Sequence, residues 1–466
     1  MTSTVTLESA LAGFNGSMIG PDDADYDAAR KVYNGMIDKS PALIAQPRTE
    51  ADVVLAVNAA RELDLLIAVR GGGHNGGGLG TCDNGLVVDL AGFDTVEVDP
   101  EAKTVRVGGG CTWGQVDRAT GEYGLATPSG IVSTTGVGGL TLGGGLGHLT
   151  RAYGLAIDNL IAADVVLADG RCVRASATEE PDLFWALRGG GGNFGIVTSF
   201  TFRLNDVSRF VAGPTFWDVD QGDQVLKAYR EFLPSAPRQL NGFFAYTTVP
   251  PAPPFPEELH LRPVCAVVWA YVGDEDDARA AMAPFLESLP EPLLHGVAVM
   301  PHAALQSAFD ALYPKGQQWY WRADFVNAIP DAAVEIHQRF GSALPTSLST
   351  MHLYPIDGAA HDVGADETPW AYRDAMWGSV YAGIGPEPAD ADSVRRWSID
   401  YFEALHPYSA GGAYVNMMMD EGEERIRASY RDNYPRLARI KAAYDPGNLF
   451  RVNQNIKPAV PSAANA

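Results

Sequence analysis

The segment Arg70-Gly71-Gly72-Gly73-His74-Asn75 has the residue types for ligand chemistry. Consecutive glycines expose successive backbone N–H groups, and without a Cβ atom the chain can press closely against a pyrophosphate. The glycine spacing differs from the dinucleotide fingerprint, and no βαβ helix follows it. A neutral imidazole is a nucleophile, so His74 beside the dimethylbenzene edge of a flavin could attack the C8 methyl group in its quinone-methide form. A plain glycine turn followed by a structural histidine is the alternative.

Two further glycine runs have the composition of loops that enclose a large planar ligand. The first extends from Thr134 to His148 and places many glycines beside β-branched residues, so that backbone amides could face such a ligand. His148 itself is interpreted as structural. The second run extends from Trp185 to Thr198 and leads into an apolar strand whose backbone could bind an adenine edge.

Short strands and helices that alternate in the first half of the chain must position these runs. Thr49 is placed to begin a helix with Asp52 in its first turn, where a carboxylate favours the helix dipole. Asp169-Gly170 predicts the tight turn of a hairpin, and Pro181 suits the first turn of a helix. β-branched stretches bounded by turn residues predict strands at 65–69, 86–90, 95–98, 104–107 and 195–202, and a hairpin over 163–174.

The composition changes near Val207, where the glycine runs stop and aromatic, proline and helical patterns take over. The stretch from Glu423 to Ala443 has helical periodicity. The chain therefore divides into a glycine-rich first part and a second part of different construction.

Length and charge limit the class of protein. The 466 residues are too many for one typical domain and suit two domains that share a large core. The net charge of -23 argues against binding to nucleic acid or to an anionic membrane. No stretch approaches the roughly 20 apolar residues of a membrane helix, and no secretory signal pattern is visible. The cysteines Cys82, Cys111, Cys172 and Cys265 match no metal spacing or disulfide framework, which indicates a reducing, cytoplasmic location and no metal.

The three glycine runs, in this order and spacing, resemble the berberine-bridge-enzyme-like branch of the vanillyl-alcohol-oxidase (VAO/PCMH-type) flavoproteins. The resemblance covers nearly the whole chain, and further segments carry it: Tyr33-Asn-Gly, Arg151-Ala-Tyr-Gly-Leu-Ala-Ile-Asp-Asn, Ala413-Tyr-Val-Asn and Tyr444-Asp-Pro-Gly-Asn-Leu-Phe-Arg-Val-Asn-Gln-Asn-Ile. It implies an α+β fold in which two small α/β subdomains bind FAD and an antiparallel sheet flanked by helices binds the substrate. The implied boundaries are 1–207 (core about 37–207) for the FAD domain, 208–410 for the substrate domain, and 411–466 for a berberine-bridge-like segment that returns to the FAD domain.

The resemblance also implies a covalent bond from His74 to the flavin 8α carbon. Many relatives add a bond from a cysteine to flavin C6, but the matching residue here is Val132, so a single bond of the bacterial type is expected. Cys111 lies in a different strand-to-helix connection and is expected to be a structural thiol. Leu146 and Met417 stand where many relatives have tyrosines, which alters the usual arrangement of the base.

Hydride transfer to a flavin requires a base for the departing proton. Tyr414 is the first candidate, although a hydroxyl with a pKa near 10 needs a cation or hydrogen-bond donors to lower that pKa. Packing within a C-terminal strand is the alternative for Tyr414. Asn416 is expected to hydrogen-bond the flavin or the substrate. Thr135 matches the position that controls oxygen access in the family, and its branched shape resembles that of valine.

Two alternating sets of side chains are further candidates, because alternation along a strand places each set on one face. Tyr320, Arg322 and Asp324 form one set, and His352 and Tyr354 form the other. Each set could roof the flavin, with Tyr320 and His352 as catalytic candidates, or face solvent. The expected cofactor contacts are Arg70, Gly71, Gly72, Gly73, His74, Asn75, Thr134, Gly136, Gly138, Gly139, Gly143, Gly144, Gly145, Gly195, Val197, Asn453 and Asn455.

These features predict an FAD-dependent oxidase, a monomer or homodimer, that takes hydride from an alcohol, a sugar, an amine or a secondary metabolite and passes the electrons to O2. The sequence is also compatible with three alternatives. The chain could be a dehydrogenase or an oxygenating enzyme of secondary metabolism, a flavin- or sugar-binding protein without catalysis, or a glycine-rich scaffold without cofactor.

Overall fold

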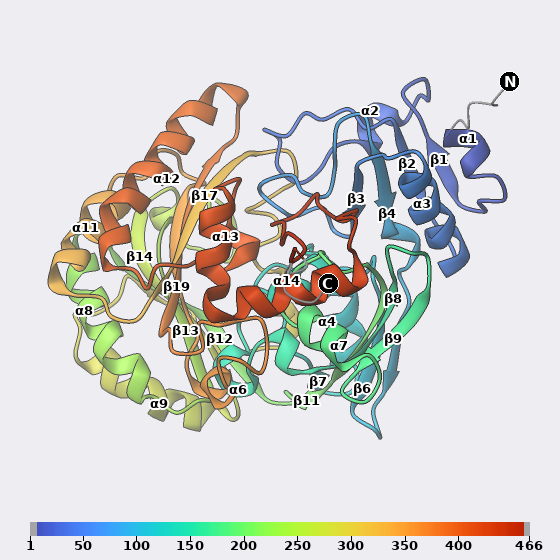
Figure 1. The fold of residues 1–466 in the computed structure, drawn as a ribbon. Helices are drawn as coiled ribbons and strands as arrows, with labels where there is room; N and C mark the ends of the chain where they lie inside the picture. The colour runs from blue at the N-terminus through green and yellow to red at the C-terminus, as the bar shows by residue number, and fades with distance from the viewer. Residues whose placement is uncertain (1–6, 461–466) are drawn as a thin grey trace, which may run out of the picture.

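The computed structural model describes residues 7–460, which form two halves side by side (Figure 1). One half carries the smaller sheets and the glycine runs, and the other is built on one large antiparallel sheet covered by helices. The expected α+β fold, with two small subdomains and a helix-flanked antiparallel sheet, is confirmed.

The first small subdomain is a four-stranded sheet in the order β1 (Ser17–Ile19), β2 (Leu43–Gln46), β4 (Leu86–Asp89), β3 (Ile67–Arg70). Strands β2 and β3 run parallel to β4, and α3 (Glu50–Glu62) packs beside them with the short helices α1 (Leu7–Ala10) and α2 (Tyr26–Ala29) nearby. Thr49 begins α3 as predicted: its Oγ1 accepts from Asp52 N at 3.2 Å, and its N–H donates to Asp52 at 2.9 Å. Strand β3 ends at Arg70, so the first glycine run follows it directly.

The second small subdomain is an antiparallel five-stranded sheet in the order β5 (Val96–Asp99), β6 (Thr104–Gly108), β10 (Ile196–Arg203), β8 (Leu160–Val166), β9 (Cys172–Ser176). Gly170, with φ +86°, supplies the left-handed residue in the predicted β8–β9 turn. The remaining elements of this subdomain are α4 (Trp113–Gly121), β7 (Leu125–Ala126), α5 (Val137–Gly143), α6 (Thr150–Tyr153), α7 (Pro181–Leu187) and β11 (Asn205–Asp206).

The large sheet has the order β15 (Leu294–His295), β12 (Phe210–Asp218), β14 (Pro263–Val272), β13 (Leu240–Thr248), β18 (Thr350–Pro355), β19 (Trp377–Gly385), β17 (Gln318–Val326), with β16 (Ala298–Val299) also on β12. Helices α8 (Gly222–Phe232), α9 (Glu275–Glu287), α11 (Asp331–Gly341) and α12 (Ala391–Leu405) share one buried apolar cluster with one face of this sheet. Residues that alternate with that face, such as Phe243, Trp321 and Tyr354, belong to the core shared with the first half. The sheet therefore presents its uncovered face to the glycine runs.

Two local expectations are corrected by the structure. The stretch expected as one helix over 423–443 is two helices, α13 (Glu423–Tyr430) and α14 (Tyr434–Tyr444). Arg431 breaks the helix at φ +46°, and Pro435, which lacks an N–H, fits the first turn of α14. The second glycine run is not only a loop, because α5 lies within it; α10 (His302–Ser307) packs against α4 nearby.

Candidate active site

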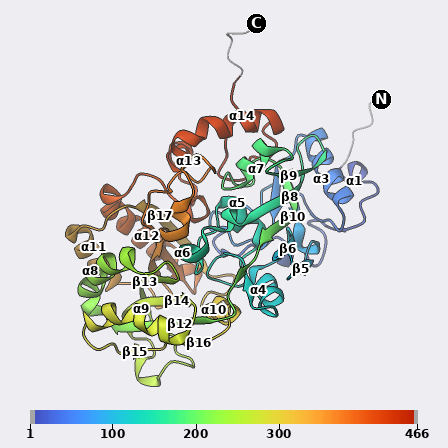
Figure 2. The ribbon, with the colours of Figure 1, turned by 90° about the horizontal axis from the view of Figure 1, so that it is seen from below.

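A cavity of about 330 Å³ lies between the glycine runs and the uncovered face of the large sheet. Helix α5, which carries part of the second run, lies between the two halves (Figure 2). The volume of the cavity is in the range of small-molecule pockets. Most of the residues singled out in the sequence line it: Arg70, Gly71, Gly72, Gly73, His74, Asn75, Thr135, Gly136, Gly138, Gly139, Gly195, Val197, His352, Tyr414, Asn416 and Asn453. The fold thus brings together segments that are more than three hundred residues apart in the sequence.

The first two glycine runs touch backbone to backbone. A Cβ atom on Gly72 would collide with the backbone of Gly136, and one on Gly136 would collide with the backbone of Gly72. Arg70, at the start of the first run, is held by Asp89 at 2.8 Å, while its Nη1 is buried without a partner among the described residues. Glycine is required here because no side chain fits between the two loops.

Two pocket-lining glycines face open space instead. A Cβ atom on Gly139 or Gly192 would meet no protein atom within 4 Å. The cavity wall at these positions is therefore bare backbone. A ligand that packs closely against the loops requires such a wall. The bare wall and the unpartnered Arg70 Nη1 fit a large planar ligand with phosphates.

His74 is positioned by contacts on two sides. Its ring stacks on Tyr33, with ring centroids 4.0 Å apart and an angle of 18° between the planes. Thr134 Oγ1 lies 3.0 Å from Nε2, within hydrogen-bonding distance, which leaves Nδ1 for another partner. Burial lowers the pKa of His74 to about 4, so the ring is neutral at neutral pH and retains its nucleophilic lone pair. Thr134 supports the ring without lining the cavity itself.

Tyr414 and Asn416 enter the cavity from a short 3-10 turn over Val415–Met417, not from a strand. The Tyr414 hydroxyl accepts hydrogen bonds from Gly145 N at 3.0 Å and from Asn416 Nδ2 at 2.7 Å. Burial nevertheless raises the pKa of Tyr414 to about 12, and these donors only partly oppose it. At neutral pH Tyr414 is therefore a protonated phenol.

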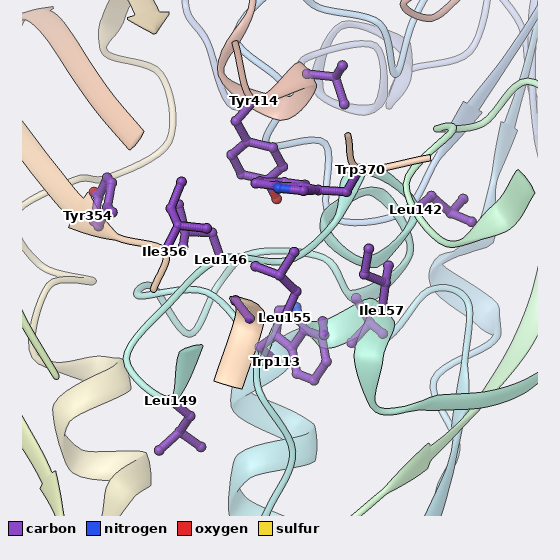
Figure 3. Close-up of a cluster of buried hydrophobic side chains, with 14 of the residues drawn as sticks. Trp113, Leu142, Leu146, Leu149, Leu155, Ile157, Tyr354, Ile356, Trp370 and Tyr414 are labelled. Atoms are coloured by element: carbon purple, nitrogen blue, oxygen red, sulfur yellow. The ribbon is translucent and has the colours of Figure 1, made fainter. Parts of the chain in front are cut away.

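The glycines Gly143, Gly144 and Gly145 lie behind the cavity rather than along it. A Cβ atom on Gly143 would strike the Asn416 amide, and one on Gly144 would strike the Trp370 ring. Figure 3 shows Trp370 against Tyr414, with ring centroids 4.9 Å apart, and Leu146 nearby. These glycines therefore make room for protein side chains, which corrects the expectation that they touch the cofactor.

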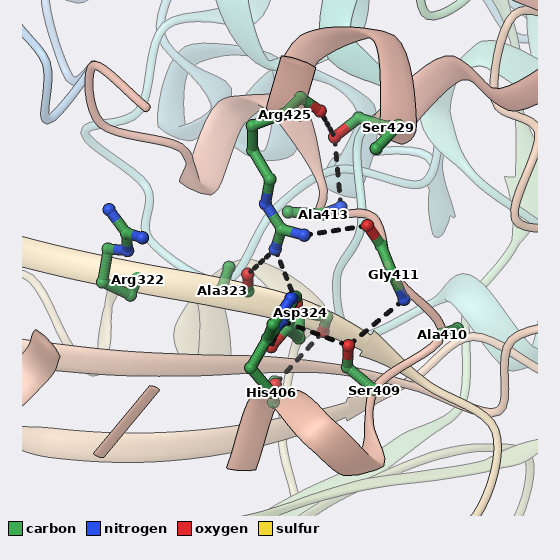
Figure 4. Close-up of polar contacts among 12 residues, drawn as sticks. Arg322, Ala323, Asp324, His406, Ser409, Ala410, Gly411, Ala413, Arg425 and Ser429 are labelled. Atoms are coloured by element: carbon green, nitrogen blue, oxygen red, sulfur yellow. Dashed lines mark hydrogen bonds and ion pairs between the residues drawn. The ribbon is translucent and has the colours of Figure 1, made fainter. Parts of the chain in front are cut away.

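In strand β17, the set of side chains that faces the cavity is not the expected one but the set that alternates with it. Trp319 and Trp321 line the cavity, whereas Tyr320 lies under Arg395 of α12 at 5.5 Å. Asp324 bonds to Arg425 at 2.5 Å and to His406 at 3.1 Å on the helix-covered side (Figure 4), and Arg322 is stacked over Phe402 of α12. The expectation that Tyr320 is catalytic is therefore wrong, because α12 covers its face of the sheet.

Strand β18 presents the expected set. His352 and Tyr354 both line the cavity, and Nδ1 of His352 is hydrogen-bonded to the Tyr354 hydroxyl. No hydrogen bond to Nε2 of His352 is present in the described chain. Burial lowers the pKa of His352 to about 3, so this imidazole is neutral at neutral pH. In the tautomer whose Nδ1–H donates to the Tyr354 hydroxyl, Nε2 can accept a proton.

The loop before Thr135 is fixed by polar contacts from the substrate side. Ser133 donates to Asp310 through its backbone N–H at 3.1 Å and through its hydroxyl, and the flanking Val132 and Thr135 line the cavity. Cys111 lies outside the cavity, with its Sγ 3.4 Å from the carbonyl oxygen of Thr95. Val132, which offers no thiol, thus stands in the cavity wall, and Cys111 does not.

The C-terminal strip closes the cavity. Asn453 lines it and donates to Gly192 O at 3.1 Å, whereas Asn455 does not line it. The consecutive residues Val452, Asn453 and Gln454 all line the cavity, and the lining of the strip ends before Asn455. The sequence also missed the cavity residues Tyr313, Trp319 and Trp321, for which aromatic identity was the one signal. Tyr33 and Gly192 line the cavity too; they lie in segments that the sequence singled out without giving these two residues a role.

A cavity walled by bare glycine loops on one side and by a sheet with polar and aromatic side chains on the other can hold a large planar cofactor against a small substrate. This is the arrangement of a cofactor-dependent oxidoreductase. A model of the FAD binding domain matches residues 41–176, and a model described as berberine and berberine like matches residues 413–457.

Individual relatives agree with these matches. The chain is 33% identical to an FAD-linked oxidoreductase of Dictyostelium discoideum, covering 92% of this chain and 91% of that protein. It is 30% identical to (R)-6-hydroxynicotine oxidase of Paenarthrobacter nicotinovorans, covering 95% of this chain and 97% of that enzyme. The structure of Physcomitrella patens BBE-like 1 superposes with a TM-score of 0.87 at 25% identity, covering 98% of this chain and 100% of that one.

The chain belongs to the berberine-bridge-like family of FAD-linked oxidoreductases. It is an FAD-dependent enzyme that oxidises a small organic substrate. Within residues 7–460 no helix is long and apolar enough to cross a membrane. In the same part of the chain, no three or more His, Cys, Asp or Glu side chains are grouped to hold a metal ion.

Gly139→Val tests the bare wall. The new side chain would occupy ligand space without meeting protein atoms, so flavin per chain should fall about tenfold while the thermal unfolding temperature of the flavin-free protein is unchanged. Visible absorbance relative to protein concentration measures the effect. Gly121→Val is the matched control, because Gly121 also has open space around its Cβ position but lies outside the cavity. Full flavin content in Gly139→Val would contradict this use of the wall.

Proposed function

We propose that the enzyme carries FAD on a single covalent bond to His74 and passes the electrons of its substrate to O2. Residues 1–207 and 411–466 would hold the cofactor, and residues 208–410 would hold the substrate. The observation that carries the covalent part is the neutral His74 ring, fixed by Tyr33 and Thr134 at the cavity wall. Val132 supports a single bond, since it offers no thiol at the position where many relatives have one.

When bound, FAD supplies the two-electron acceptor, taking hydride from a substrate C–H bond and returning both electrons to O2 as hydrogen peroxide. The chain supplies binding and a proton acceptor. His352 is the better base of the two expected candidates, because it is neutral and has Nε2 free, whereas Tyr414 retains its proton at neutral pH. Tyr414 and Asn416 would then position the substrate or cofactor by hydrogen bonding.

Thr135 supports O2 as the acceptor. It lines the cavity, as Val132 does, and its branched side chain has the shape of a valine. The fixed loop, held by Ser133 on Asp310, keeps that wall in place.

The acceptor is tested by the yield of hydrogen peroxide under air. An oxidase should release one peroxide for each substrate molecule oxidised and each O2 consumed. A dehydrogenase would consume little O2 until a quinone or dye is added, and an oxygenating enzyme would consume O2 without matching peroxide. A flavin-binding protein without catalysis would show no anaerobic bleaching with any substrate.

A further inference from the structure

We propose, building on the proposed function, that the substrate is a neutral aromatic alcohol, with its ring against Trp319 and Trp321 and its hydroxyl on the His352–Tyr354 pair. The proposal rests on how the large sheet distributes side chains over the substrate half of the cavity.

The aromatic side of this half is a continuous set of edge-packed rings. The centroids of Trp319 and Trp321 lie 5.7 Å apart, and those of Tyr313 and Trp319 lie 5.6 Å apart, both pairs in T-shaped contact. Trp321 also rests on Gly76, where a Cβ atom would collide with its indole. Rings packed edge to face hold their positions and offer flat surfaces to a further aromatic ring.

One strand, β19, separates the polar side chains of β18 from the aromatic side chains of β17. Ala382 pairs with Trp321 on one side and with Thr350 on the other, and Val380 pairs with His352. Only these small side chains separate the indole from the Thr350 and His352 groups, and all of them line the cavity. A ring on the aromatic side therefore brings a short substituent within reach of the polar side.

No permanent charge is present in this half. The described residues of 208–410 that line the cavity include no Asp, Glu, Lys or Arg, and His352 is neutral because burial lowers its pKa to about 3. A substrate ammonium or carboxylate would lose its hydration without gaining an ion pair, which is costly in a buried site. The -23 net charge of the chain additionally repels anions.

The polar groups that remain free in this half are too few for a sugar. The Thr350 hydroxyl donates to the carbonyl oxygen of Tyr246 at 2.9 Å, and the Tyr354 hydroxyl is bonded to His352. The indole N–H groups of Trp319 and Trp321 are buried, so Nε2 of His352 and the Tyr313 hydroxyl remain for a substrate. Each sugar hydroxyl left unpaired would cost about 1–3 kcal/mol. One or two hydroxyls on an aromatic frame match the available donors and acceptors.

The reaction then balances within the site. The carbinol C–H leaves as hydride to FAD, the O–H proton passes to Nε2 of His352, and the C–O bond becomes a carbonyl. O2 reoxidises the cofactor and leaves as hydrogen peroxide, so one alcohol and one O2 give one aldehyde or ketone and one peroxide.

The test compares three probes on the flavin-loaded full chain: benzyl alcohol, benzylamine and cellobiose. Benzylamine has the same ring with a cationic group, so it isolates the effect of charge. Perturbation of the flavin absorption gives dissociation constants without turnover, and anaerobic bleaching reports oxidation. Benzyl alcohol should bind at least about tenfold more tightly than either other probe. Trp321→Leu should weaken its binding about tenfold, and Tyr320→Leu, on the helix-covered face of the same strand, should not.

Equal or tighter binding of cellobiose or benzylamine to the wild-type protein would overturn the proposal, and this comparison requires no variant to fold. Equal effects of Trp321→Leu and Tyr320→Leu would also overturn it. A sugar that bleaches the flavin while benzyl alcohol does not bind would remove the substrate class and leave the proposed oxidase intact. Tight benzyl alcohol binding that depends on Trp321, without peroxide, would support the class and contradict the proposed acceptor.

Discussion

Acid precipitation of the flavin-loaded wild-type protein should give a yellow pellet, and the same treatment of His74→Ala should give a colourless one. The physical reason is that burial keeps His74 neutral, with a pKa of about 4, while Thr134 engages Nε2. The remaining nitrogen, Nδ1, is therefore free to bond to carbon. The effect is expected to be all or none, because unfolding releases a bound flavin completely unless a covalent bond retains it. Pellet absorbance and the mass of the flavin-bearing peptide measure it.

Thr134→Val is the matched control for this prediction. It keeps the imidazole and removes only the hydrogen bond to Nε2, so the flavin should still become attached, but more slowly during reconstitution with FAD. His74→Ala should still bind FAD in its folded state, because the glycine loops remain. Pigment released from the unfolded wild-type protein would refute the bond, and pigment retained by unfolded His74→Ala would place it on another residue.

Replacement of His352 by Ala should lower kcat/KM by about 10²–10⁴-fold, the usual contribution of a general base. Tyr414→Phe should lower it only about tenfold, the effect of losing one hydrogen bond that positions a ligand. The reason is the charge state of each group at neutral pH: His352 is neutral with Nε2 free, and Tyr414 is a protonated phenol. Steady-state oxidation of a substrate found by anaerobic bleaching measures both variants.

The pH profile separates the two candidate bases. A His352 base with a pKa of about 3 is already deprotonated above about pH 4, so kcat/KM should be flat from about pH 5 to about pH 9. A Tyr414 base with a pKa of about 12 would instead make kcat/KM rise about tenfold for each pH unit over that range. Added imidazole should restore part of the activity of His352→Ala. A rising profile, or no rescue together with a larger loss in Tyr414→Phe, would assign the base to Tyr414.

Features that depend on a few neighbouring residues could be predicted from the sequence. Thr49 and Asp52 begin α3 through their own hydrogen bonds, and Gly170 occupies the left-handed turn that a side chain disfavours. The first glycine run and His74 line the cavity as predicted, because bare backbone and an imidazole can both approach a ligand closely. The family resemblance added the order of the domains and the kind of cofactor.

Features that depend on which surfaces meet could be decided only by the tertiary structure. The alternation in β17 is a property of the sequence, but whether Tyr320 or Trp321 faces the cavity depends on the packing of α12 against the strand. Gly143 to Gly145 have the same composition as the ligand-facing glycines, yet they make room for Asn416 and Trp370, which arrive from distant parts of the chain. The pKa values of His352 and Tyr414 follow from burial, which no spacing encodes. The sequence alone therefore determined the backbone chemistry of the cofactor loops, and the packing of the two halves determined the substrate side.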